Sequence, residues 1–251
     1  MSNTARVREI VELEPPWIEA LPRLSDRPPR DPGRKWRGHG ELLPCLPCAI
    51  PGGTQGDPVR NWALALRRRC SVCGCGMRGP FCNMTITRRQ NEWPGGVYTT
   101  TIPGPMHKSC ALYSALVCPF FKYPTSRERR SDTHALRGDA AVLVFNGYGE
   151  AFFAEPTWWG AYHAFAYSEL VERIPFGPSR RDLLPLYEAA VVEDAKVIDT
   201  STALYWGRSA ADQQRLAECK EADDVYLLEK LRLDHPLAAE RIDQSGGHPN
   251  G

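Results

Sequence analysis

A chain of 251 residues, 42% of them hydrophobic, is long enough to bury a core of its own, in one large domain or two small ones. No apolar run approaches the roughly 20 residues that span a bilayer, and residues 1–14 are polar and charged, so we expect a cytoplasmic protein with no membrane segment and no secretory signal. The net charge of +1 hides a division: residues 60–137 carry 13 Lys and Arg against three acids, or +10, and residues 138–251 carry 10 against 19, or −9.

Proline dominates residues 1–59 and prevents long helices there. Aromatic and aliphatic residues such as Trp17, Trp36 and Leu42 are scattered through the same stretch. We therefore expect an extended Pro-rich arm that lies over a core. The segment 61–69, which follows the arm, is compatible with one helical turn or more.

A cysteine-rich module is expected over residues 60–124. Residues 97–102 (Val-Tyr-Thr-Thr-Thr-Ile) have strong β character, and residues 83–87 are a suitable partner strand. Turn residues at 93–96, Trp-Pro-Gly-Gly, lie between the two strands, so the pattern predicts a β-hairpin. Residues 107–117 are compatible with a helix, which Pro119 would end.

Residues 138–251 are expected to form a third, acidic part of mixed α/β structure, joined to the module by an exposed, charged linker over residues 125–137. Residues 140–145 have the pattern of a buried strand. Residues 146–149, Asn-Gly-Tyr-Gly, indicate a turn, and residues 150–155 indicate a second strand, so the three segments predict a hairpin.

Two helices are predicted after this hairpin. Ser179 is a suitable N-cap for a helix over about 180–194, and Ser209 is a suitable N-cap for a helix over about 210–231. Between the hairpin and the helices lies an aromatic cluster: Trp158, Trp159, Tyr162, His163, Phe165 and Tyr167.

The strongest chemical signal is a pair of metal-ligand motifs. Cys70 and Cys73 form C-x2-C, and after a gap of 33 residues His107 and Cys110 form H-x2-C. Two close pairs of such ligands, separated by an insert the size of a hairpin, suit one tetrahedral Zn²⁺ ion. Gly74 permits a tight turn after the first pair, and the second pair stands at a helix start, where both side chains face the same way.

The turn that carries Cys70 and Cys73 has the form of a zinc knuckle. The order of this knuckle, a hairpin and a helix resembles a treble-clef zinc finger. The resemblance implies an α+β fold, in which a treble-clef-like zinc module is combined with the Pro-rich arm and the mixed α/β C-terminal portion. Four protein ligands fill a tetrahedron and leave no position for water, so we expect one structural Zn²⁺ ion rather than a catalytic one.

The other cysteines leave a second metal site open. Cys45 and Cys48 form another C-x2-C pair, and with Cys82, Cys118 or His39 they could hold a second zinc ion or an iron–sulfur group. Cys75 follows the first knuckle closely enough to replace Cys73 as a ligand. A redox dithiol at Cys45 and Cys48 is disfavoured, because the prolines around the pair do not suit the strand-to-helix setting of that motif.

Four short motifs carry a further resemblance: C-x-x-C-G at residues 70–74, G-P-x-C at 79–82, H-x-x-C-A at 107–111 and C-P-F at 118–120. Together they are similar to a group of uncharacterised actinobacterial and phage-associated proteins. The resemblance implies that Cys82 and Cys118 belong with the four zinc ligands, and it implies no activity. The stretch between Cys82 and His107 is longer than in that group, and the pair of Cys45 and Cys48 is additional.

Arginines gather in and beside the module, where they alternate with aromatic residues. The candidate contact residues are Arg67, Arg68, Arg69, Arg88, Arg89, Arg129 and Arg130. Arginine with aromatic neighbours can bind backbone phosphates and stack on unpaired bases. We therefore expect a zinc-stabilised binding protein whose basic module contacts nucleic acid or an acidic protein surface; the acidic part of the same chain could also neutralise the module.

Two alternatives remain open from the sequence. The first is a metalloenzyme, with its active site either at a second metal bound by Cys45, Cys48, Cys82 or Cys118 or in an aromatic C-terminal pocket around Glu155, Trp158, Trp159 and His163. The second is a phage or host interaction protein without catalysis. No nucleotide-binding or hydrolase motif is present in the chain.

Overall fold

The computed structural model describes residues 17, 58–86, 92–93, 97–100, 104–117, 140–154, 161–177, 180, 182–204, 206, 209–236 and 240. Its α-helices are α2 (Pro58–Leu66), α3 (Lys108–Val117), α5 (Leu183–Asp194) and α6 (Ala210–Asp234), with a short 3₁₀ helix, η3 (Thr200–Thr202). Its strands are β1 (Phe81–Ile86), β2 (Glu92–Trp93), β3 (Val97–Thr100), β4 (Ala140–Ala154) and β5 (Ala161–Phe176). None of the described helices is both long and apolar enough to cross a membrane.

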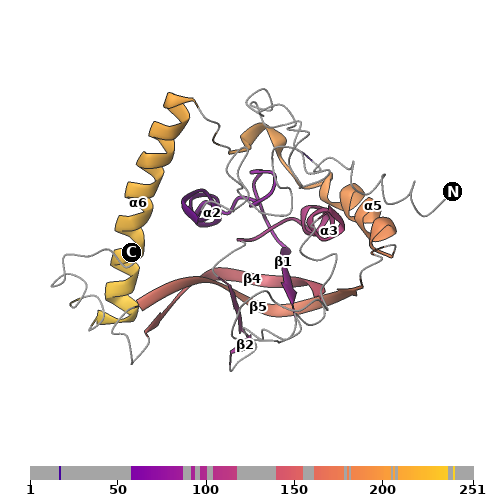
Figure 1. Cartoon of the computed structure of the whole chain (residues 1–251), viewed down its shortest axis with the longest axis horizontal. Helices are drawn as coiled ribbons and strands as arrows, with labels where there is room; N and C mark the ends of the chain where they lie inside the picture. Colours follow the sequence, from indigo (N-terminus) through magenta and orange to yellow (C-terminus); the bar gives the residue numbers. More distant parts are fainter. Residues whose placement is uncertain are drawn as a thin grey trace, which may run out of the picture.

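The described strands form one antiparallel sheet in the order β1-β4-β5-β3-β2. Figure 1 shows α2 and α3 over one face of this sheet, with α6 beside α2 and α5 beside α3. The predicted combination of helices with antiparallel strands is therefore confirmed. The division into three parts stays a prediction, although β1 and β3 share this sheet with β4 and β5.

The predicted hairpin within the cysteine module is wrong in its pairing. β1 pairs with β4, so that Cys82 lies opposite Val144, whereas β3 pairs with β2 on one side and with β5 on the other. The short hairpin that does form joins β2 to β3, so the turn residues at 93–96 connect a different pair of strands. Strand propensity and turn residues identify segments, but the partner of a strand is decided by which apolar faces can be buried together.

The turn predicted at residues 146–149 is also wrong, because β4 runs through it as one strand and pairs with β5 along its length. The ladder is irregular between Val144 and Phe145, where the register shifts. Gly147 lies opposite Ser168, and a Cβ atom at Gly147 would stand 2.0 Å from the Ser168 Oγ. This glycine therefore permits a close approach of two strands. Besides forming turns, glycine within a strand commonly has this role.

We expect Gly147→Ala to destabilise the protein by about 1 kcal/mol, because the new methyl group displaces the Ser168 hydroxyl from a tightly paired position. The measurement is the free energy of unfolding in urea. The double variant Gly147→Ala with Ser168→Ala, which removes the displaced atom, should recover most of the loss. A loss of equal size in the double variant would mean that the overlap with Ser168 is not the cause.

The helix predictions succeed except for the starts of α2 and α5. α3 occupies the predicted segment, and α6 begins after Ser209, whose hydroxyl accepts a hydrogen bond from the Asp212 amide as an N-cap. The helix predicted from residue 180 begins later, as α5, after Asp182, which makes no side-chain cap. Ser179 lies outside the described residues, and so does the Pro-rich arm predicted over residues 1–59, apart from Trp17, Pro58 and Val59. The last two belong to α2, which begins at Pro58 and not at the predicted residue 61.

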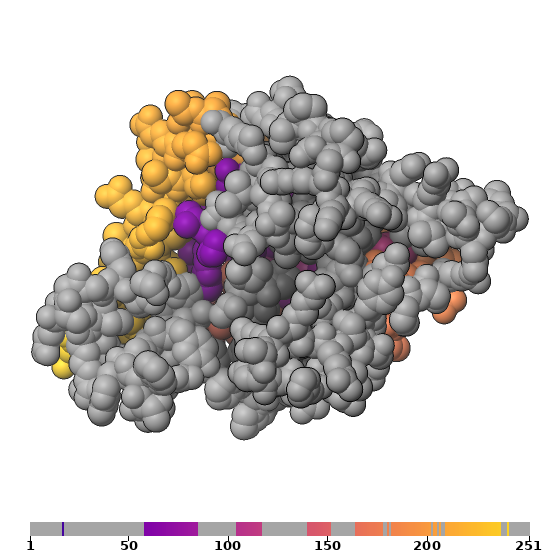
Figure 2. Space-filling model, viewed as in Figure 1, coloured from indigo at the N-terminus to yellow at the C-terminus, as the bar shows by residue number. Residues whose placement is uncertain are grey.

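The core lies between α3 and the sheet. Every residue of α3 from Ser109 to Leu116 is buried, and the largest fully buried side chains include Tyr113, Phe145, Phe165 and Tyr167. By contrast, most side chains of α6 are exposed or half-buried. In Figure 2, α6 forms much of the coloured surface, and part of α2 is visible beside it. α3, which carries two of the predicted zinc ligands, is thus the central helix of the fold.

Candidate metal centre

The first pair of predicted ligands lies in a tight β-like turn. Arg69 and Gly76 form an isolated antiparallel β-bridge across this turn, and the Cys70 amide donates to the Cys75 carbonyl oxygen at 2.9 Å. Within it, the Gly74 amide donates to the Cys70 carbonyl oxygen at 2.8 Å, and Gly74 has a φ of 73°. Only glycine adopts that conformation at little cost, so the C-x2-C-G pattern folds locally into a knuckle.

The second pair reaches the knuckle through the extended segment before α3. Met106 exchanges two backbone hydrogen bonds with Cys82 of β1, at 2.9 and 3.1 Å, and the Ser71 amide donates to the Pro105 carbonyl oxygen at 2.9 Å. This segment is thus held between β1 and the knuckle. It delivers His107 directly before α3 and Cys110 into the first turn of that helix.

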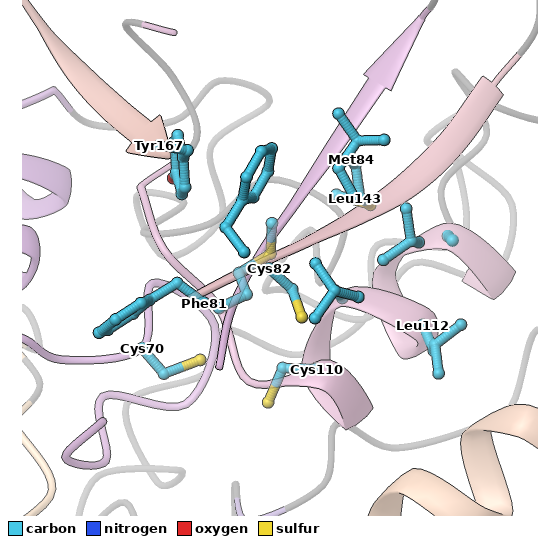
Figure 3. Close-up of a cluster of buried hydrophobic side chains, with 14 of the residues drawn as sticks. Cys70, Phe81, Cys82, Met84, Cys110, Leu112, Leu143 and Tyr167 are labelled. Atoms are coloured by element: carbon cyan, nitrogen blue, oxygen red, sulfur yellow. The ribbon is translucent and has the colours of Figure 1, made fainter. Parts of the chain in front are cut away.

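The four predicted ligands come together. Their Sγ and imidazole nitrogen atoms all lie within 4.8 Å of one another. The His107 Nδ1 is 3.4 Å from the Cys73 Sγ and 3.9 Å from the Cys110 Sγ. In a zinc tetrahedron with bonds of about 2.3 Å to sulfur and 2.0 Å to nitrogen, ligand atoms lie about 3.5–3.8 Å apart. Figure 3 shows Cys70 and Cys110 approaching one another from the knuckle and from α3.

The site is closed to solvent. Cys70, Cys73 and Cys110 have no exposed surface, and His107 is 6% exposed. The His107 Nε2 lies 3.1 Å from the Gly76 carbonyl oxygen, a partner to which it can donate a hydrogen bond. That bond fixes the tautomer in which Nδ1 carries the free lone pair, so the nitrogen that faces the thiols is the one able to bind a metal.

The ionisable groups of the site shift one another's pKa values. Burial alone would raise the pKa of Cys70, but hydrogen bonds from Cys110 and Cys73 and the charge of His107 lower it well below its usual value. Burial raises the pKa of Cys73 and of Cys110. Burial would lower the pKa of His107, yet the Cys70 thiolate raises it to about 9. A divalent cation would therefore displace protons from this group as it binds.

The other cysteines do not belong to this group of four ligands where the structure describes them. Cys75 is buried, and its Sγ points at the Cys73 carbonyl oxygen at 3.8 Å, outside the group of four. Cys82 is buried in β1, where burial raises the pKa of its thiol, and it belongs to no group of three or more potential ligands among the described residues. Cys45, Cys48 and Cys118 lie outside the described residues, so the second site stays a prediction.

The predicted contact arginines separate into different roles. Arg67 donates to both carboxylate oxygens of Asp223 on α6, at 2.8 and 3.1 Å, and to the Ala63 carbonyl oxygen, so its contacts hold α2 against α6. Arg68 is exposed, with its guanidinium 5.8 Å from the centre of the Phe81 ring, and Arg69 is half-buried. Arg88, Arg89, Arg129 and Arg130 lie outside the described residues.

The aromatic cluster contributes to the core where it is described. Phe165 and Tyr167 are buried, and Tyr167 accepts a hydrogen bond from the Asn83 amide at 3.3 Å. Glu155, Trp158 and Trp159 lie outside the described residues, as does the side chain of His163. The aromatic pocket thus stays a prediction as well.

Sequence patterns missed three groups that contact His107 or the backbone of α3: the Gly76 carbonyl oxygen, Asp194 and Arg180. The first is a backbone atom, which no residue type reveals. Asp194 accepts a hydrogen bond from the Ser109 amide, and Arg180 donates to the last carbonyl oxygens of α3. Both side chains come from segments far from α3 in the sequence, so no local spacing connects them to it. We found no family model, no curated protein and no solved structure that matches this chain.

Proposed function

We propose that this protein is a zinc-stabilised binding protein, in which Cys70, Cys73, His107 and Cys110 hold one structural Zn²⁺ ion. The observation that carries the proposal is a buried Cys3His group whose ligand atoms all lie within 4.8 Å of one another. Four protein ligands leave no coordination position for a water molecule or a substrate, so the ion itself would not catalyse a reaction. The six described cysteines form no disulfide with one another, which suits the cytoplasm as the proposed compartment.

The donor set favours zinc over magnesium and calcium. Three thiolates and one imidazole are soft and borderline ligands, which Mg²⁺ and Ca²⁺ do not prefer. Elemental analysis of the purified chain, together with its absorption spectrum, tests the assignment: one zinc per chain without visible absorption is expected. A folded chain that holds no metal would overturn the proposal. Iron with visible absorption, or more than one metal per chain, would instead point to the predicted second site.

We propose nucleic acid as the partner. Arg68 and Arg78 are exposed and lie on the two strand-like segments that enter and leave the knuckle. These two segments lie side by side, because the Met77 amide donates to the Arg68 carbonyl oxygen at 2.9 Å. Residues 58–86, which include both of these segments, contain no Asp or Glu. The Arg68 guanidinium lies 5.8 Å from the centre of the buried Phe81 ring, so Arg68 would contact a nucleic acid through its charge. Arg67 is assigned a structural role, because Asp223 binds its guanidinium.

The double variant Arg68→Ala with Arg78→Ala is expected to weaken binding to a single-stranded DNA or RNA oligonucleotide. Each phosphate contact contributes about 0.7 to the slope of log affinity against log salt for a single strand, so the double variant should lower the slope by about 1.4. Fluorescence anisotropy at several salt concentrations measures both affinity and slope.

The control is Arg173→Ala, which removes an exposed arginine from β5 in the acidic part of the chain. It should leave both affinity and slope unchanged. Absence of any binding at low salt would refute nucleic acid as the partner, and an acidic protein surface would then be the remaining class. Binding that the double variant does not weaken would refute the assignment to the knuckle arginines.

A further inference from the structure

The first turn of α3 is capped from another part of the chain. His107 stands at the N-cap position, where a side chain normally accepts a hydrogen bond from one of the first helical amides. Its imidazole cannot do so, because Nδ1 faces the thiols and Nε2 faces the Gly76 carbonyl oxygen. The Asp194 Oδ2 instead accepts from the Ser109 amide, at 2.8 Å and 85 residues along the chain.

The opposite end of α3 is capped in the same way. The Arg180 Nη1 donates to the carbonyl oxygens of Ala115, at 3.1 Å, and Leu116, at 2.5 Å. A carboxylate at the N-terminus and a guanidinium at the C-terminus both complement the helix dipole. Arg180 precedes α5 and Asp194 is its last residue, so the α5 segment holds α3 at both ends. Figure 1 shows the two helices side by side.

Burial makes the Asp194 cap hard to replace. Asp194 is 9% exposed and Ser109 is completely buried, so solvent cannot easily satisfy the Ser109 amide if the carboxylate is removed. The unpaired amide would lie one residue from Cys110 and two residues from His107. A shift of the first turn that relieved it would move both ligands together.

We propose that Asp194 is a positioning residue for the metal centre, which holds the first turn of α3 so that His107 and Cys110 meet the knuckle. The inference rests on the proposed zinc site. It has a reciprocal consequence: if docking of α5 favours metal binding, metal binding favours docking of α5 by the same factor. Residues outside the ligand set that orient ligands in this way change metal affinity by about 10- to 100-fold when they are replaced.

The test compares three variants by zinc affinity, measured in competition with a chelator, and by the absorption spectrum of the cobalt-substituted chain. Asp194→Ala should bind zinc about 10- to 100-fold more weakly and alter the cobalt bands, since two ligands shift. Asp194→Asn should stay within about threefold of the wild type, because an amide oxygen caps as well as a carboxylate does. Glu193→Ala, an exposed neighbour paired with Lys196, should change neither measurement.

The outcomes separate this inference from the proposed function. A wild-type chain that binds no zinc would overturn the metal site itself. A wild-type chain that binds zinc, with Asp194→Ala of equal affinity, would overturn only the role of Asp194. If Asp194→Ala does not fold, amide hydrogen exchange of the wild-type chain tests the coupling between α5 and the metal site instead. Removal of zinc should reduce amide protection in α5 as well as in α3. Unchanged protection of α5 in a chain that stays folded would refute the coupling.

Discussion

Replacement of Cys110 by serine is expected to abolish stoichiometric zinc binding and to destabilise the protein by more than about 4 kcal/mol. The binding free energy of a structural zinc ion is folding free energy, because its ligands meet only in the folded chain. Cys110 also lies in α3, whose buried residues form the centre of the core, so a loosened first turn affects the packing around it. Zinc per chain after dialysis and the urea unfolding curve measure the two effects.

Cys75→Ser is the matched control for this experiment. Cys75 is as buried as the ligands, and its thiol contacts both the thiol and the carbonyl oxygen of Cys73, to which a serine hydroxyl can also donate. It should therefore keep one zinc per chain, as should Cys219→Ser on α6. Retention of zinc at wild-type affinity by Cys110→Ser, or its loss in Cys75→Ser, would show that the ligand set is wrong.

The metal ligands could be predicted because each half of the site is local. Cys70 and Cys73 lie within one tight turn, and His107 and Cys110 lie at one helix start, so short spacing determines which way each pair faces. α6 could be predicted for the same reason, since Ser209 caps it within its own first turn. Local geometry is what a single sequence encodes most directly.

The arrangement of the strands could not be predicted, because it depends on contacts between distant segments. β1 has a suitable neighbour in the residues of β3, yet the ladder that forms joins it to β4, where Ala141, Val142 and Val144 are buried with it. Gly147 fits a turn and a close strand approach equally well until its partner Ser168 is known. Asp194 illustrates the same limit at the candidate site, since an acidic residue at the end of a helix carries no sign of the second helix that it caps.

Gly74→Ala is expected to destabilise the protein by more than about 3 kcal/mol and to weaken zinc binding. A non-glycine residue in this left-handed conformation costs about 1–2 kcal/mol. In addition, the new Cβ would stand 2.1 Å from the Leu204 carbonyl oxygen, which is a backbone atom and cannot rotate away. Because Gly74 follows Cys73 directly, any relief of the overlap would distort the knuckle. Urea unfolding and zinc competition measure the two losses.

The segment that contains Leu204 has little freedom to withdraw. The Leu204 amide donates to the Gly74 carbonyl oxygen at 2.9 Å, and two residues later the Trp206 carbonyl oxygen accepts from the buried Arg60 at 2.8 Å. Gly149→Ala is the control, since its Cβ would meet no atom within 4 Å, and it should change stability by less than about 0.5 kcal/mol. A Gly74→Ala chain as stable as that control would mean that the connection from η3 to α6 does not lie against the knuckle in solution.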